Sequence, residues 1–267
     1  MNMDVVNLRE FYSGKLGIAA ERSIAMALST LWDTSKGRNE RLLGMGYPAP
    51  YLDRFASDSK ECMAFMPAAQ GAVQWPISKP SATALVYDEE LPLADSSIDK
   101  ILMVHLLEHS ESPEDTLREA WRVLAPNGKI LLVLPNRRGL WARFEHTPFG
   151  TGRPFSRGQI GNLLRNAMFS PDAWSDALHF PPMKRDRFLS MQPGLERLGR
   201  RIWPVFSGVV IVEATKKMVQ GLPVTARAMR KAFVPVLVPQ GNTRGTSKEV
   251  PDNTFQFSGQ TTRTVSK

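Results

Sequence analysis

The chain has 267 residues, enough for one large α/β domain with additions or for two small domains, and its 42% hydrophobic content is typical of a soluble globular protein. No apolar run reaches the roughly 20 residues that a membrane-spanning helix needs, and the beginning of the chain has no apolar signal-peptide core, so we expect a cytoplasmic protein. The single cysteine, Cys62, excludes an internal disulfide, and the formal net charge of +8 makes the protein basic.

The first half of the chain alternates helix-like and strand-like segments. From Phe11 to Trp32, apolar residues recur at three- and four-residue spacing and predict one helix. Ser112 and Pro113 favour the start of a second helix, and Pro126-Asn127-Gly128 ends it. Because this helix lies between two apolar runs, it predicts a strand–helix–strand unit of a parallel sheet. Short apolar runs predict strands at 41–46, 61–67, 82–88, 98–107 and 128–136.

The second half begins with a loop rich in Gly, Arg and aromatic residues, which runs to Ser156. A helix is predicted over Gln159–Met168, and two late strands over 172–180 and 206–217. Residues 240–267 are polar and rich in Gly, Ser and Thr, so we expect disorder there. The pattern suggests three parts: an N-terminal helical cap over 1–36, an α/β domain over 37–222, and a basic polar C-terminal extension over 223–267.

The basic surplus lies wholly in the second half. Residues 1–136 carry 13 Lys and Arg against 18 Asp and Glu, a balance of −5, and residues 137–267 carry 21 against 8, a balance of +13. Such a surplus suits nucleic acid, an acidic partner or anionic lipid, but a solvated surface with a basic tail is the favoured interpretation. The segment Arg197–Phe206 combines arginines with aromatic residues, yet no nucleic-acid-binding motif accompanies it.

The stretch from Tyr87 to Asn136 resembles class I S-adenosylmethionine-dependent methyltransferases of the small-molecule type. The motifs stand in the family's order and spacing: Asp88, Leu91-Pro92, Asp99, Leu107-Glu108-His109 and the turn Arg122–Gly128. The match to the family is good over residues 41–136. Over residues 139–217 only the general layout of the family is matched. The resemblance implies a doubly wound α/β fold, with a seven-stranded, mostly parallel, Rossmann-like sheet whose last strand is antiparallel.

The resemblance also implies S-adenosylmethionine as the cofactor. Glycines in the family's first loop let the backbone approach the cofactor closely, which a Cβ would prevent. The acid after the third strand accepts from the adenine amino group, and the end of the fourth strand flanks the methionine portion. The cofactor-binding residues implied in this chain are Gly44, Gly46, Gln70, Asp88, Glu89, His105 and Leu106.

The chain departs from the family pattern at three places. Pro48 replaces the third loop glycine, and Leu42 stands where the family has an acid. Met66, Pro67 and Ala68 occupy the corner where another acid holds the ribose hydroxyls, with Gln70 the nearest polar side chain. Each charge-assisted hydrogen bond contributes about 1.5–3 kcal/mol, so the sequence leaves open whether cofactor binding survives.

No motif identifies a catalytic residue, because methyl transfer depends mainly on alignment and uses a base only when the acceptor must lose a proton. His105, His109 and His146 are weak candidates for such a base, with core packing as the alternative for the first two. The string His105-x-x-Glu108-His109 resembles a zinc motif but begins on a predicted strand instead of a helix, so we expect no metal.

The loop after the fifth predicted strand is the candidate for substrate binding, since loops on a rigid scaffold commonly carry specificity. Its aromatic residues supply apolar walls, and its arginines can neutralise an anion. A lid that merely covers the sheet edge is the alternative. The substrate residues predicted here are Trp141, Arg143, His146, Phe149 and Arg153.

These features favour an S-adenosylmethionine-dependent methyltransferase that acts on a small-molecule acceptor. Two alternatives stay open: a non-catalytic, methyltransferase-like binding or regulatory protein, motivated by the missing acids, and a nucleic-acid methyltransferase, motivated by the basic second half. The sequence predicts neither the acceptor nor the oligomeric state.

Overall fold

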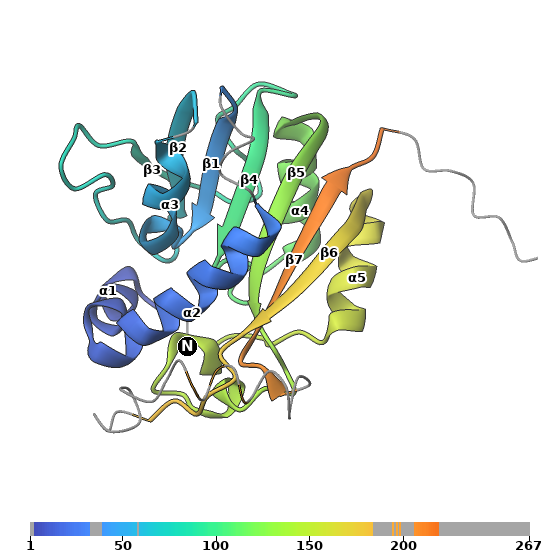
Figure 1. Cartoon of the computed structure of the whole chain (residues 1–267). Coiled ribbons are helices and arrows are strands. Elements are labelled where there is room, and N and C mark those ends of the chain that lie inside the picture. Colours follow the sequence, from blue (N-terminus) through green and yellow to red (C-terminus); the bar gives the residue numbers. More distant parts are fainter. Residues whose placement is uncertain are drawn as a thin grey trace, which may run out of the picture. The chain divides into compact units, whose positions relative to one another are not determined.

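The computed structural model describes residues 3–32, 39–57, 59–183, 194, 196, 198 and 206–218 (Figure 1). Within these residues the chain forms one sheet with helices on both sides. The elements are α1 (Val5–Ser13), α2 (Lys15–Leu31), β1 (Arg41–Gly46), α3 (Ala49–Ala56), β2 (Glu61–Pro67), β3 (Thr83–Val86), β4 (Ile98–Val104), α4 (Pro113–Val123), β5 (Leu124–Pro135), the short helices η2 (Trp141–Arg143) and η3 (Pro148–Gly150), α5 (Arg157–Asn166), β6 (Phe169–Ala177) and β7 (Val209–Lys216).

The seven strands lie in the order β3-β2-β1-β4-β5-β7-β6. The pairs among β1 to β5 are parallel, and β7 runs antiparallel to both of its neighbours, β5 and β6. The predicted sheet, with its last strand antiparallel, is thereby confirmed. The strand order reverses between β1 and β4, and open α/β sheets bind ligands at the carboxyl ends of the strands beside such a point.

Successive residues of a strand point to opposite faces of the sheet, and each face has its own core. On one face, α1, α2 and α3 pack over a set that includes Leu102, Val104 and Leu131. On the other, α4 and α5 pack over Ile101 and Met103 among others. Figure 1 shows α2 crossing in front of the sheet with α4 and α5 behind it. The fold is therefore doubly wound, as predicted.

The N-terminal region differs from the single helix predicted over Phe11–Trp32. It forms two helices that Gly14, with extended backbone, separates. Asp4 caps α1 by accepting a hydrogen bond from the Val6 amide, so helix begins before the predicted start. A Cβ on Gly17 would lie 2.0 Å from the Phe11 carbonyl oxygen, so glycine there lets the chain turn sharply between the two helices.

The short helix α3 is a further element that the apolar pattern does not predict. It begins within the sequence Pro48-Ala49-Pro50, where prolines suit the first turn of a helix, and it buries Tyr51, Leu52 and Phe55.

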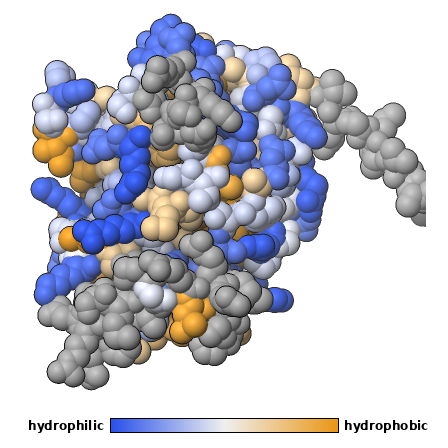
Figure 2. Space-filling model, viewed as in Figure 1, coloured by the Kyte–Doolittle hydropathy of each residue, from blue (hydrophilic) through white to orange (hydrophobic). Residues whose placement is uncertain are grey.

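The helices and strands described above all belong to one compact unit, Met1–Pro223. The predicted C-terminal extension and most of the basic segment Arg197–Phe206 lie outside the described residues. Among the described helices, none combines the length and the apolar character that crossing a membrane requires. Figure 2 shows one face of the molecule, where hydrophilic side chains surround small separate hydrophobic patches, as is ordinary for a protein surface in water.

Candidate functional site

The carboxyl ends of β1 and β4 lie close together at the centre of the sheet. The Tyr47 amide donates to the Val104 carbonyl oxygen over 2.7 Å, immediately after Gly46. Gly46 has a φ of +82°, and a Cβ on it would lie 2.2 Å from that same oxygen. Glycine is therefore required at position 46 for the backbone itself to pass β4.

Gly44 also lies against protein atoms. A Cβ there would approach side-chain carbons of Pro48 at 2.6 Å and Leu52 at 2.8 Å. The bare Gly44 backbone therefore lets the first turn of α3 pack directly on β1. The expected role of both glycines in cofactor binding stays a prediction, since these contacts already account for glycine at each position.

Helix α1 fills the crevice beyond these strand ends. The Tyr12 ring stacks on Tyr47, with ring centroids 5.7 Å apart and planes at 25°, and lies 5.9 Å from the His105 ring. Phe149 closes the other side, with its ring centroid 4.9 Å from that of His105. We call Tyr12, Tyr47, Tyr51, His105 and Phe149 the Tyr12 cluster; each of its members is at most 8% exposed.

A chain of hydrogen bonds runs through the Tyr12 cluster. The Tyr12 hydroxyl lies 2.8 Å from His105 Nε2 and 3.0 Å from the Tyr51 hydroxyl, and His105 Nδ1 lies 3.1 Å from Glu108 Oε1. With Glu108 as a carboxylate, Nδ1 donates to it and Nε2 accepts from Tyr12. Burial, followed by the neighbouring Tyr51, raises the pKa of Tyr12 well above its ordinary value, so Tyr12 is a neutral phenol at pH 7.

The backbone of His105 is itself unusual. Its φ of +52° lies in the left-handed region, which costs a residue other than glycine about 1–3 kcal/mol. The Gln70 side-chain amide donates to the His105 carbonyl over 2.9 Å and so helps to hold this turn. A strained residue kept in place by its neighbours at a strand end is typical of a functional site.

A cavity of about 270 Å³ opens beside the Tyr12 cluster, at the ends of β2, β3 and β4; we call it the small cavity. Buried polar atoms usually have hydrogen-bond partners, yet Gln70 Oε1 and both ring nitrogens of His109 have none. Burial lowers the pKa of His109, so its ring is neutral and offers one donor and one acceptor. The residues that line the small cavity include Pro67, Gln70, Asp88, Glu89, His105, Leu106 and His109.

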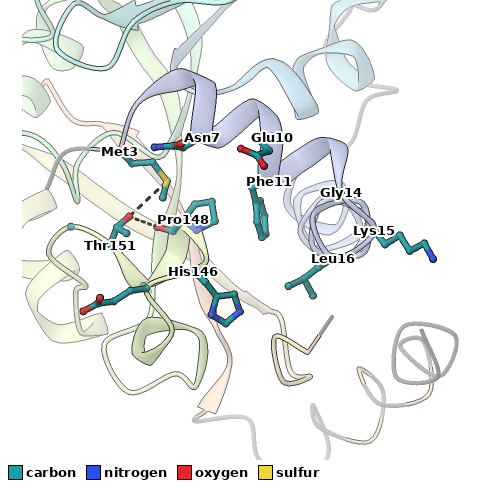
Figure 3. A pocket seen from close by; sticks show the side chains of 13 residues that line it. Met3, Asn7, Glu10, Phe11, Gly14, Lys15, Leu16, His146, Pro148 and Thr151 are labelled. Atoms are coloured by element: carbon teal, nitrogen blue, oxygen red, sulfur yellow. Dashed lines mark hydrogen bonds between the residues drawn. The ribbon is translucent and has the colours of Figure 1, made fainter. Parts of the chain in front are cut away.

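A second cavity, of about 860 Å³, lies between α1 and the loop over 145–152; we call it the loop cavity (Figure 3). In Figure 3 Phe11 points from α1 toward this loop, which carries His146 and Pro148. The Thr151 hydroxyl donates to the Pro148 carbonyl over 2.9 Å and lies 3.8 Å from the Met3 sulfur, so it links the loop to the start of α1.

The structure brings together some predicted site residues and separates others. Gln70, Asp88, Glu89, His105 and Leu106 line the small cavity together, whereas Gly44 and Gly46 are not among its lining residues.

Of the predicted substrate residues, His146 lines the loop cavity, and Arg143 and Arg153 are exposed on the surface. Trp141 and Phe149 are buried in the core, and the Trp141 indole donates to the Phe180 carbonyl over 2.6 Å. These two aromatic residues therefore hold the loop against the sheet.

Sequence reasoning missed the contribution of α1. Val5, Leu8 and Tyr12 are its buried residues, and their spacing of three and four is the signal that predicts an apolar helix face. Glu108 was identified as part of a family motif and of the zinc-like string, not as the hydrogen-bond partner of His105. Within the described part of the chain, no three acidic, histidine or cysteine side chains gather as a metal-binding group.

Comparisons with known proteins agree with this architecture. Residues 44–132 match the family model of the methyltransferase domain, and no curated protein matches the chain significantly in sequence. A solved S-adenosylmethionine-dependent methyltransferase from Thermotoga maritima, described as a possible histamine N-methyltransferase, aligns with a TM-score of 0.56 and 20% identity, over 80% of this chain and 96% of that one.

Two further solved structures are similar. A methyltransferase from Archaeoglobus fulgidus aligns with a TM-score of 0.52 and 13% identity, over 73% of this chain and 94% of that one. The [4+2]-cyclase SpnF aligns with a TM-score of 0.51 and 18% identity, over 73% of this chain and 80% of that one. The resemblance inferred from the motifs is thus supported: residues 44–132 match the methyltransferase-domain model, and the chain shares the fold of solved S-adenosylmethionine-dependent methyltransferases.

Proposed function

We propose that this protein is a methyltransferase that transfers a methyl group from S-adenosylmethionine to a small-molecule acceptor. The observation that carries the proposal is the small cavity, where five of the residues expected to bind the cofactor meet beside buried polar atoms without partners. When bound, the cofactor supplies an electrophilic methyl group. The chain's own residues hold the nucleoside, place the acceptor and exclude water.

The residues of the small cavity fit the nucleoside part of the cofactor. The Asp88 carboxylate can accept from an adenine amino group while it also accepts from the Thr116 hydroxyl over 2.8 Å. Leu106 supplies an apolar surface for the flat ring, and Gln70 and His109, whose unpartnered polar atoms are covered by protein here, can bond ribose hydroxyls once their side chains turn toward the cavity. A neutral hydrogen bond contributes about 0.5–1.5 kcal/mol, less than one to a charged group, so we expect weaker cofactor binding than a carboxylate at the ribose corner would give.

The methionine arm of the cofactor does not fit beside Tyr12 in the position that α1 holds here. The family places this arm near the ends of the first and fourth strands, where the Tyr12 ring lies between Tyr47 and His105. Binding of the whole cofactor therefore requires α1 to move away. We propose that α1 pivots at Gly14, the one residue between it and α2, into the space of the cavities of about 860 and 970 Å³ that flank it.

The loop cavity suits the acceptor. Its volume of about 860 Å³ lies in the range of roughly 300–1,000 Å³ that is common for small-molecule sites. Once α1 has moved, His105 Nε2 loses its bond to Tyr12 and can take a proton from an acceptor, with Glu108 holding the opposite ring nitrogen. An acceptor that carries no acidic proton would not need this step.

Titration calorimetry with S-adenosylmethionine tests the proposal. Asp88→Ala should weaken cofactor binding about 10- to 150-fold, because a hydrogen bond to a charged group contributes about 1.5–3 kcal/mol. Glu90→Ala is the matched control: Glu90 is exposed, lies two residues away and is not among the residues of the small cavity, so affinity should stay unchanged. Equal affinity for the Asp88 variant and the wild type would remove the small cavity from cofactor binding.

A non-catalytic nucleoside-binding protein is the second candidate, and the position of Tyr12 favours it. The [4+2]-cyclase SpnF has a similar fold, and one fold can carry different functions. Adenosine binding without any S-adenosylmethionine binding at millimolar concentration, even when Tyr12 is replaced by Phe, would favour this candidate. The nucleic-acid methyltransferase alternative gains no support from the described residues, since the basic segment lies mostly outside them.

A further inference from the structure

We propose that the small cavity selects adenine nucleosides that lack an amino-acid arm over S-adenosylmethionine, because Tyr12 takes the place of that arm. This inference rests on the proposed function, since it assumes that the small cavity is the nucleoside site. It adds a ligand preference that the chain's own N-terminal helix imposes. The preferred ligands are uncharged nucleosides of the size of adenosine or 5′-deoxy-5′-methylthioadenosine.

The crevice next to the small cavity is filled by the chain itself. The Tyr12 ring contacts Tyr47 after β1 and His105 after β4, with ring-centroid distances of 5.7 and 5.9 Å. Leu8 is fully buried one turn earlier on the same helix. A charged arm that extends from the ribose toward the end of β1 would meet this ring before it met solvent.

The small cavity stays accessible while α1 is in this position. Met3, just before α1, contributes to its wall, and His105 separates it from the Tyr12 ring. Its volume of about 270 Å³ falls just below the roughly 300–1,000 Å³ of drug-sized ligand sites, which suits a nucleoside better than the longer cofactor. A nucleoside without an arm can therefore bind with α1 unmoved.

Polar contacts hold Tyr12 in its place. Its hydroxyl bonds both His105 Nε2 and the Tyr51 hydroxyl, so moving α1 breaks two buried hydrogen bonds and exposes apolar surface. A ligand that binds only to a minor conformation has its apparent affinity reduced by the fraction of that conformation. The apparent affinity for S-adenosylmethionine is reduced in this way, because it binds only when α1 has moved. The affinity for the shorter nucleoside is not reduced.

Calorimetric titration of the full chain with 5′-deoxy-5′-methylthioadenosine and with S-adenosylmethionine tests the inference. For the wild type we expect the nucleoside to bind at least tenfold more tightly. Tyr12→Phe keeps the ring and removes both hydrogen bonds of its hydroxyl, so it should tighten S-adenosylmethionine binding about tenfold, or about 1.4 kcal/mol. Affinity for the nucleoside should change less than twofold.

Ser13→Ala is the matched control, because it removes the hydroxyl of an exposed neighbour on α1, which bonds the Glu10 carbonyl, while the bonds of Tyr12 to His105 and Tyr51 stay in place. It should leave the ratio of the two affinities at its wild-type value. As a second measurement, S-adenosylmethionine should speed amide hydrogen exchange over Val5–Ser13 in the wild type, and the nucleoside should not.

The outcomes separate this inference from the proposed function. Tighter binding of S-adenosylmethionine than of the nucleoside by the wild type, with no response to Tyr12→Phe, would overturn the inference and leave the proposed function standing. Failure of both ligands to bind at millimolar concentration would overturn the nucleoside site itself. Equal gains for both ligands in the Tyr12 variant would also contradict a role for Tyr12 in choosing between them.

Discussion

At the scale of single residues, His105 and His109 stand out because both are histidines at the edge of the small cavity with different surroundings. His105 has partners at both ring nitrogens, Tyr12 and Glu108, whereas both ring nitrogens of His109 are buried without partners. The first arrangement fixes a ring in one orientation. The second leaves a ring whose nitrogens are covered by protein and have no partner, so we expect the His109 ring to turn toward the small cavity when a ligand binds.

The burial of His109 predicts a pH dependence of stability. Burial lowers the pKa of His109 in the folded protein, while an unfolded histidine takes up a proton near pH 6.5. As the pH falls below about 6.5, the unfolded chain therefore binds more protons than the folded one, and stability decreases by at most about 1.4 kcal/mol per pH unit for this group. Above that pH the contribution is fully present.

Denaturant unfolding at pH 7.5, 6.0 and 5.0 measures this effect. His109→Asn should flatten the fall in unfolding free energy between pH 6.5 and 5. The control His146→Asn changes an exposed histidine and should leave the wild-type slope intact. A His109 variant with the wild-type slope would show that another group causes the acid sensitivity.

At the scale of elements, the close contact between α3 and β1 explains why a glycine is present at position 44. Pro48 and Leu52 lie so close to Gly44 that an added methyl group would overlap both. Pro48, which interrupts the family's glycine pattern, is thus a packing partner of the glycine that remains. The divergent loop therefore forms a close helix–strand contact.

This contact predicts a stability cost for the smallest substitution. Gly44→Ala should lower the free energy of unfolding by about 1–3 kcal/mol, the usual cost of overfilling a packed core. The control is Gly158→Ala in α5, where no heavy atom lies within 4 Å of the new methyl group. That change should stabilise the protein by about 0.5–1 kcal/mol, because alanine favours a helix over glycine. A neutral Gly44→Ala would contradict the packing described here.

The helices also show which structural features can be predicted from local sequence patterns. Strand positions and α4 follow from local patterns, because apolar runs and helix-end residues act within a few positions. The break at Gly14 was missed, since the apolar spacing continues smoothly through Leu16 while the turn depends on the crossing of two helices. The meeting of Tyr12 with His105 joins residues 93 positions apart, and no local pattern encodes such a contact.

At the scale of the whole molecule, the family motifs predicted a seven-stranded, mostly parallel sheet with its last strand antiparallel, but not the extent to which α1 fills the crevice at the strand ends. Asp88, Glu89 and Leu106 meet at one cavity because the fold brings the ends of β3 and β4 together. Trp141 and Phe149 were predicted to bind substrate, yet they are buried, because aromatic residues in a loop suit a core as well as a pocket.

The most direct test of the account is a crystal structure of the full chain grown with S-adenosylmethionine. We predict adenine density between Asp88 and Leu106, ribose hydroxyls near Gln70 and His109, and a Tyr12 side chain withdrawn from His105. Tyr12 still bonded to His105 with no nucleoside density in the small cavity, or a cofactor bound elsewhere on the chain, would contradict it.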